Sequence, residues 1–249
     1  MTGSRWLAPA GAGAGIDLVC LPHAGGGAAP YRGWPAHAGL RMRAVQLPGR
    51  EVRIGEPPCT SMEALVDALV AQLEPVRVAP YVLFGHSMGA LIAYRLCCAL
   101  QERGLALPLR LFVSASRPPQ RPRATPWHDL PEAAFIERVL ALGGTPAEVF
   151  EHPMLRPLAL GLLRADFALA EGCPATPVVL ACPITALAGS ADRHVPASEL
   201  DGWRELTDAG FDLALFEGDH FFLRRQGAAI QALIARRLGP GAAMPMTPC

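Results

Sequence analysis

Ser87 is the residue of this chain best placed for covalent chemistry, because it lies at the centre of the sequence Gly-His-Ser-Met-Gly at residues 85–89. An apolar run at 81–84 precedes this G-x-S-x-G motif and a helical pattern follows it, which is the setting of a nucleophile elbow. The two flanking glycines allow the backbone to pass close to itself where a Cβ would clash. The turn would expose the hydroxyl at a helix N-terminus, where developing negative charge is favoured. We therefore predict that Ser87 is a catalytic nucleophile.

A nucleophilic serine needs a base and an orienting acid, which follow this type of elbow in the order Ser, acid, His. Asp192 lies in the loop just after the apolar run 183–188, and His220 lies in the loop just after the run 212–216. Both would lie at the carboxyl ends of strands, where open α/β sheets collect ligands. The alternative is a surface aspartate and a partly buried histidine, but the order favours a triad. We predict that Asp192 orients His220, that His220 accepts the Ser87 proton, and that Asp219 points elsewhere.

The first predicted strand is followed by a glycine-rich loop. In hydrolases with this elbow, one oxyanion-hole N–H comes from such a loop and the other from the residue after the nucleophile. Those residues would be Ala24 and Met88. The glycines at 25–27 could instead cradle a phosphate, but the loop lacks the Lys and Ser/Thr of a P-loop. His23 and His86 flank this region and are expected to give positional support.

Cofactor chemistry finds little support in the sequence. The chain has no lysine, which excludes Schiff-base and pyridoxal-phosphate chemistry. The seven histidines are scattered without metal-ligand spacing, so we expect neither a cofactor nor a metal.

The elements around these residues alternate between strands and helices. Strands are predicted at 16–21, 43–46, 81–84, 109–114, 184–188 and 213–216. Helices are predicted at 61–73, opened by a capping box at 60–63, and at 88–104, 198–207 and 227–238. This alternation is typical of an α/β fold with a mostly parallel central sheet flanked by helices, as one domain over residues 1–249.

Residues 117–172 interrupt the alternation with helical patterns at 131–142 and 153–170. A crossover helix needs only about a dozen residues, and this segment is far longer. We therefore predict a helical lid insertion rather than a plain crossover, with apolar faces lining an acyl channel. Residues 239–249 are predicted to be a disordered tail.

The whole pattern resembles the type II thioesterases, the stand-alone editing enzymes of polyketide and nonribosomal peptide synthases. The segments that carry the resemblance are 21–26, 46–51, 85–89, 142–146, 164–167 and 220–223. The resemblance implies an α/β-hydrolase fold with a helical lid. It also implies hydrolysis of acyl groups from the phosphopantetheine thiol of an acyl- or peptidyl-carrier protein. The chain differs from the family in having Asp219 where a glycine usually precedes the histidine.

Two other classes of function stay open at this point. One is a carboxylesterase acting on small esters, or a thioesterase that releases a single product. The other is a hydrolase fold without catalysis that serves as a binding module, which the intact set Ser87, Asp192 and His220 disfavours.

Composition is that of a single soluble domain. The chain has 249 residues, of which 51% are hydrophobic, enough to bury a full core. Its 22 basic and 22 acidic residues give a formal net charge of 0, so nothing suggests nucleic acid or an anionic membrane as partner. No signal pattern or membrane-spanning run is evident, and the seven cysteines form no C-x-x-C pair. We expect a cytoplasmic monomer with reduced thiols.

Arg117, Arg121 and Arg123 form the densest basic cluster of the sequence. They could dock an acidic carrier protein at the base of the predicted lid, since charges at an interface rim accelerate encounter. The alternative is a solvated Pro/Arg linker between the sheet and the insertion.

Overall fold

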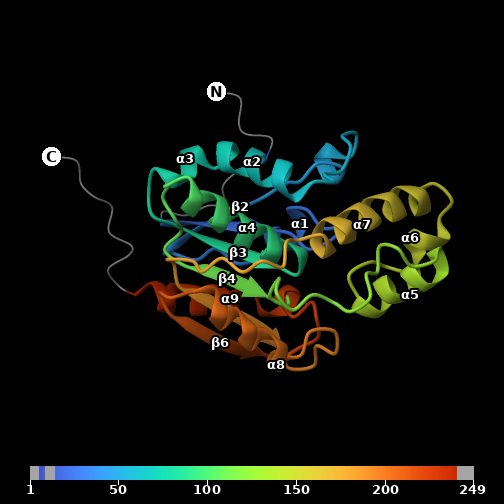
Figure 1. Ribbon diagram of the computed structural model, residues 1–249. Helices are drawn as coiled ribbons and strands as arrows, with labels where there is room; N and C mark the ends of the chain where they lie inside the picture. The colour runs from blue at the N-terminus through green and yellow to red at the C-terminus, as the bar shows by residue number, and fades with distance from the viewer. Residues whose placement is uncertain (1–5, 9–14, 240–249) are drawn as a thin grey trace.

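A parallel sheet forms the centre of the molecule (Figure 1). The computed structural model describes residues 6–8 and 15–239, and within them the sheet has six strands in the order β2-β1-β3-β4-β5-β6. The strands are β1 (Ile16–Leu21), β2 (Leu40–Ala44), β3 (Tyr81–His86), β4 (Leu111–Ser114), β5 (Ile184–Gly189) and β6 (Phe211–Phe216). Each strand is parallel to its neighbours, so their carboxyl ends meet at one edge. The predicted α/β class is confirmed, and the strand order reverses between β1 and β3, where such sheets bind ligands.

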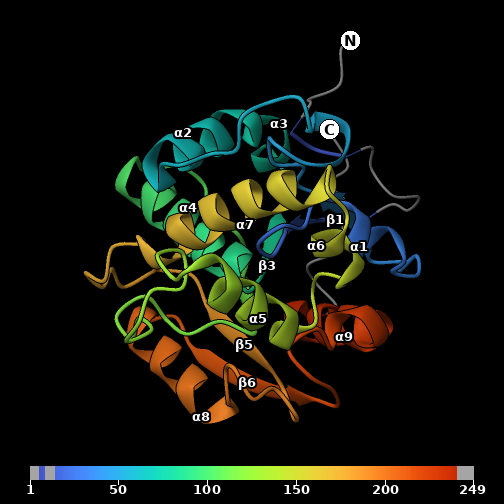
Figure 2. The same cartoon turned by 90° about the vertical axis from the view of Figure 1, so that its right-hand side faces the viewer.

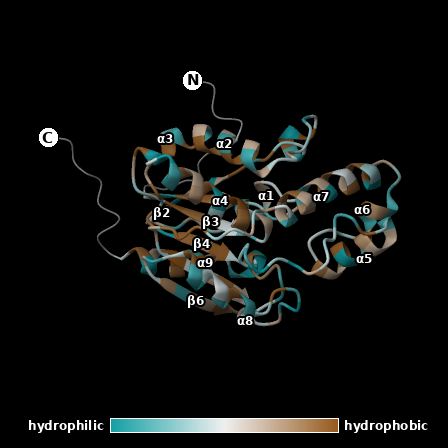
Figure 3. Cartoon of the chain, viewed as in Figure 1, coloured by the Kyte–Doolittle hydropathy of each residue, from teal (hydrophilic) through white to brown (hydrophobic). Residues whose placement is uncertain are grey.

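Helices cover both faces of the sheet. In β1, Val19 and Leu21 belong to a core shared with α2 (Met62–Gln72) and α4 (Met88–Glu102). Leu18 and Cys20 belong to a second core, shared with α1 (Ala29–Arg32) and α9 (Leu223–Leu238). Figure 3 shows the strands as a brown, hydrophobic centre. Burial on both faces explains why the central strands are continuous apolar runs in the sequence.

The prediction for the edge strand β2 was wrong by three residues at its start. We expected 43–46, and the strand is Leu40–Ala44. The Nε atoms of Arg41 and Arg43 lie 2.5 and 3.0 Å from Oδ1 of Asp17 on β1. An edge strand that is half exposed and carries charged partners has no apolar run to mark it.

The remaining helical segments of the sheet domain are short. They are η1 (Glu51–Arg53), α3 (Glu74–Arg77), α8 (Ala197–Leu200) and η2 (Asp201–Leu206). The helix predicted at 198–207 is thus α8 followed by a 3-10 turn, and α9 begins four residues before the predicted position. The capping box was wrong by one residue, because Oγ of Ser61 accepts the Ala64 N–H at 3.2 Å and caps α2. Gly104, with φ at 63°, follows the end of α4 as predicted.

All the regular structure of the predicted insertion is helical, and it begins at Glu132. It contains α5 (Glu132–Leu142), α6 (Glu148–Glu151) and α7 (Leu155–Glu171), and its described residues hold no strand. Figure 2 shows α5 and α7 in front of the sheet edge at which β1 and β3 end. The insertion has a small core of its own, made of Trp127, Phe135, Val139, Phe150, Leu160, Leu163 and Phe167. Its position fits a lid, and its role as one stays a prediction.

Two further observations concern the ends and the surface of the fold. No helix within the described residues is both long and apolar enough to cross a membrane. The tail predicted at 239–249 lies outside the described residues from position 240 onward.

Candidate active site

The turn between β3 and α4 is a strained elbow with Ser87 at its tip. Ser87 has φ of 55° and ψ of −118°, which few residues other than glycine adopt. A Cβ on Gly85 would lie 2.1 Å from the Gly89 carbonyl oxygen, and a Cβ on Gly89 would lie 2.2 Å from the Leu21 carbonyl oxygen. The predicted steric role of both glycines is confirmed. Such strain is typical of functional sites, where the surrounding structure maintains it.

Three sequence-distant side chains form one hydrogen-bonded chain. His220 Nδ1 lies 2.8 Å from Oδ2 of Asp192, and His220 Nε2 lies 3.2 Å from Oγ of Ser87. Asp192 and His220 are both buried. An ionised carboxylate only accepts hydrogen bonds, so Nδ1 donates to Asp192 and Nε2 is free to accept the Ser87 proton. The structure therefore brings together the three side chains predicted from the sequence.

The carboxylate of Asp192 is held in its ionised form. Burial acts to raise its pKa, but the hydrogen bond and charge of His220 together with the His194 and Val195 amides outweigh that effect, and the pKa lies below its usual value. The amides of His194 and Val195 also donate to Oδ1 of Asp192, at 2.8 and 3.0 Å. The loop after β5 thus fixes the carboxylate in place.

The neighbouring acid Asp219 has a different partner. Its Oδ1 accepts the Phe221 N–H at 2.8 Å and so shapes the turn before α9. The expectation that it does not orient His220 is confirmed by this geometry.

The two predicted oxyanion donors, Ala24 and Met88, lie beside the same cavity as Ser87 and His220. The amide of Ser87 already donates to the Ser114 carbonyl at 2.8 Å and is not free for another acceptor. In the described part of the chain, neither Ala24 N–H nor Met88 N–H has a protein acceptor. Their role as an oxyanion hole stays a prediction at this point.

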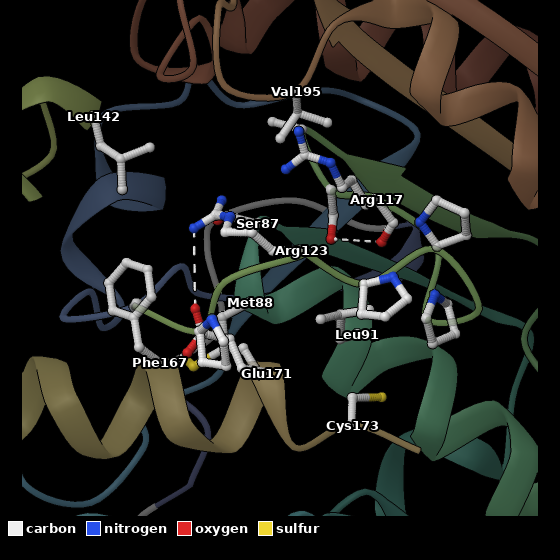
Figure 4. Close-up of a pocket in the computed structure, with 18 of the residues that line it drawn as sticks. Ser87, Met88, Leu91, Arg117, Arg123, Leu142, Phe167, Glu171, Cys173 and Val195 are labelled. Atoms are coloured by element: carbon white, nitrogen blue, oxygen red, sulfur yellow. Dashed lines mark hydrogen bonds and ion pairs between the residues drawn. The ribbon is translucent and has the colours of Figure 1, made fainter. Parts of the chain in front are cut away.

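A cavity of about 140 Å³ opens next to Ser87 (Figure 4). The sheet domain contributes Leu91 and Val195 to its wall, and the insertion contributes Phe167 and Arg123. A smaller cavity of about 20 Å³ adjoins Ser87 between β-strand loops and the insertion. The walls are mainly apolar, which suits an acyl chain or a pantetheine arm.

The basic cluster proposed for docking is largely neutralised within the chain. Its members contact acidic side chains in the pairs Arg117–Glu199, Arg121–Glu205 and Arg123–Glu171. Arg123 also stacks on the Trp127 ring, 3.6 Å from its centroid, and burial lowers its pKa to about 10. These contacts favour the linker interpretation, and docking by this cluster stays untested.

His23 and His86 pack around His220 as neutral rings. The ring centroids of His86 and His220 are 5.5 Å apart, and His86 Nδ1 lies 2.9 Å from Oγ of Ser114. Burial lowers the pKa of His23 to about 3 and lowers that of His86 well below its usual range. Neither ring carries charge near neutral pH, which agrees with positional support.

Stability should therefore fall in mild acid. The folded protein binds fewer protons at His23 and His86 than the unfolded chain, so stability is lost as pH falls below the unfolded value of about 6.5. Each histidine should contribute a slope of about 1.4 kcal/mol per pH unit, down to about pH 3 for His23. Urea unfolding between pH 7 and pH 4.5 measures the slope. The variant His86→Asn should show a shallower slope of stability against pH, and exposed His152→Asn serves as the control. An unchanged slope in His86→Asn would contradict the assignment of His86 as a neutral ring in the folded protein.

Sequence reasoning did not assign two buried charges near the site. Arg50 and Asp166 form an ion pair of 2.6 Å, with side chains only 3% and 1% exposed. Both lie in segments that carried the family resemblance, but the sequence left Asp166 undecided between a surface charge and a gate. In the part of the chain that is described, no group of three or more His, Cys, Asp or Glu is arranged to hold a metal.

Comparison with known proteins agrees with this geometry. The thioesterase domain family model matches residues 17–238. The gramicidin S biosynthesis protein GrsT of Aneurinibacillus migulanus is 35% identical over 226 residues, which cover 88% of this chain and 88% of that protein.

Two solved structures of similar proteins are also thioesterases. BorB, a type II thioesterase from the borrelidin biosynthetic cluster, is 35% identical with a TM-score of 0.79, covering 96% of this chain and 99% of that one. YbtT, a type II thioesterase from the yersiniabactin pathway, is 32% identical with a TM-score of 0.82, covering 92% and 95%.

Proposed function

This chain belongs to the thioesterase family, and from that premise we propose that it hydrolyses acyl groups from the phosphopantetheine thiol of carrier proteins through an acyl-serine intermediate. Its role would be editing and regeneration of a polyketide or nonribosomal peptide synthase. YbtT comes from an NRPS/PKS biosynthetic pathway, BorB from the borrelidin biosynthetic cluster and GrsT from gramicidin S biosynthesis. The observation that carries the proposal is the hydrogen-bonded chain Ser87–His220–Asp192 beside an apolar cavity.

In the first step His220 accepts the Ser87 proton at Nε2 while Oγ attacks the thioester carbonyl carbon. The tetrahedral oxyanion is held by the Ala24 and Met88 amides, at the N-terminus of α4. Asp192 stabilises the imidazolium that forms and keeps its orientation.

In the second step the carbonyl re-forms and the pantetheine thiolate leaves. A thiol has a pKa near 8.5, so the thiolate departs readily; it takes up the proton held by His220, which returns to its neutral form. A water that His220 deprotonates then attacks the acyl-serine ester, and the product carboxylic acid leaves with Ser87 restored.

The proposal includes the partner and the compartment. The enzyme acts as a monomer in the cytoplasm, on acyl- or peptidyl-carrier proteins. The cysteines within the described residues are free thiols, which suits a reducing compartment.

A matched substrate panel tests the function. One acyl group is attached to a carrier protein as thioester, to free pantetheine as thioester, and to a simple alcohol as oxyester. We expect kcat/KM to be highest on the acyl-carrier protein and lowest on the oxyester, because the protein partner adds binding and the thiolate leaves readily.

The same panel separates the other functions. An oxyester rate equal to the thioester rate would indicate a carboxylesterase. In a second series, in which carrier proteins bear different acyl groups, activity on a single acyl group would indicate product release. Failure of a fluorophosphonate probe to label Ser87 would indicate a binding module without catalysis.

A further inference from the structure

The strongest unassigned feature is the buried pair Arg50–Asp166, which joins three segments distant in sequence. The guanidinium of Arg50 binds the carboxylate with both terminal nitrogens, Nη1 to Oδ2 at 2.6 Å and Nη2 to Oδ1 at 2.9 Å. Arg50 comes from the loop after β2, and Asp166 comes from α7 of the insertion. This two-point geometry fixes orientation as well as distance.

The third segment is the loop after β1. The amide of Gly25 donates to Oδ2 of Asp166 at 2.7 Å, and Nη1 of Arg50 donates to the Gly26 carbonyl at 3.2 Å. Arg50 Nε also donates to the Pro48 carbonyl at 3.1 Å. The pair therefore forms hydrogen bonds with the two residues directly after Ala24. The N–H of Ala24 itself is the proposed oxyanion donor.

Helix α7 approaches the same loop through a second side chain. A Cβ on Gly25, which has φ of 76°, would lie 2.8 Å from Cδ2 of Leu163. Ala24 itself packs against the core of the insertion. The position of the loop is thus set jointly by the sheet domain and by the seated insertion.

We infer that Asp166 is a positioning residue for catalysis. With Arg50 it holds the Gly25 amide in place, and this orients the Ala24 N–H toward the oxyanion. The orientation depends on the packing of α7 against the sheet domain. The inference rests on the proposed acyl-serine function. It couples the insertion to transition-state stabilisation rather than only to substrate access. A buried ion pair is by itself weak evidence for stability, so a role in orientation is the more specific explanation.

Asp166→Asn tests the inference, because the amide keeps the shape of the side chain and removes its charge. One ligand is a trifluoromethyl ketone with a pantetheine-like arm: Ser87 Oγ adds to its carbonyl carbon, the proton passes to His220, and the alkoxide occupies the oxyanion hole. The other is the corresponding unreactive thioether. We expect kcat/KM on acyl-pantetheine to fall, and Ki of the ketone to rise, by the same factor of about 10². Kd of the thioether should not change.

The matched control is Asp17→Asn, which removes the charge of another buried carboxylate that two arginines bind, near the amino end of β1. It should leave Ki of the ketone at the wild-type value. Arg50→Lys keeps a positive charge but loses the two-point contact, and it should shift Ki in the same direction by a smaller factor, even if Asp166→Asn does not fold.

Two results would overturn the inference. One is a wild-type Ki for the ketone in both Asp166→Asn and Arg50→Lys. The other is an equal weakening of ketone and thioether, which indicates a purely structural role. Full activity of Ser87→Ala would instead rule out the proposed acyl-serine function. Failure of that function is therefore distinguishable from failure of the inference about Asp166.

Discussion

Ser87→Ala is expected to yield a folded protein that has lost hydrolysis by a factor on the order of 10⁶ in kcat. The hydroxyl is the proposed attacking group, and its Oγ lies 3.2 Å from His220 Nε2. The oxyanion donors and the cavity persist in the variant, so a small residual rate over water should remain. Single-turnover kinetics on an acyl-carrier protein measure the loss.

Ser198→Ala is the control, since Ser198 is an exposed serine of α8. Its rate should equal that of the wild type. Circular dichroism and thermal unfolding establish that both variants are folded. Turnover near the wild-type rate in folded Ser87→Ala would rule out an acyl-serine intermediate.

Asp192→Asn is expected to retain the fold and to lose a factor of about 10⁴ in kcat. The amide oxygen can still accept the His194 and Val195 N–H groups that Oδ1 accepts now. The amide NH₂ would then face His220 Nδ1, where the carboxylate accepts a hydrogen bond at 2.8 Å. That arrangement favours the proton on Nε2, and His220 could no longer accept the Ser87 proton.

Asp219→Asn is the matched control, because it makes the same change on the residue next to His220. It removes a charge from a side chain that accepts the Phe221 N–H and should leave kcat close to the wild-type value. Near-normal turnover in Asp192→Asn together with a crippled Asp219→Asn would show that the acid has been misassigned. The rate at several pH values separates loss of the base from loss of the fold.

Much of the candidate site was predictable because it depends on local sequence. Ser87, Asp192 and His220 each lie just after a strand, and the backbone of a parallel sheet places such residues at one edge. Gly85 is likewise required by the close approach of a sharp turn to its own backbone. These features need only the order of strands and helices along the chain.

Elements with weak local patterns were harder to place. Strand β2 lies at the edge of the sheet, where Arg41 and Arg43 satisfy Asp17 and replace the apolar run of a central strand. The helix cap at Ser61 rather than Thr60 depends on one hydrogen bond, which neighbouring hydroxyl residues can form almost equally well.

Asp166 and Asp192 show most clearly what each level of structure determines. The sequence by itself predicted Asp192 as the acid of a triad, because its place after a strand is a local signal. It could not assign Asp166, which has the pattern of a charge on a helix surface. Only the tertiary structure buries Asp166 against Arg50 and the Gly25 amide. A buried carboxylate takes its role from the donors that surround it, and those donors come from segments that folding alone brings together.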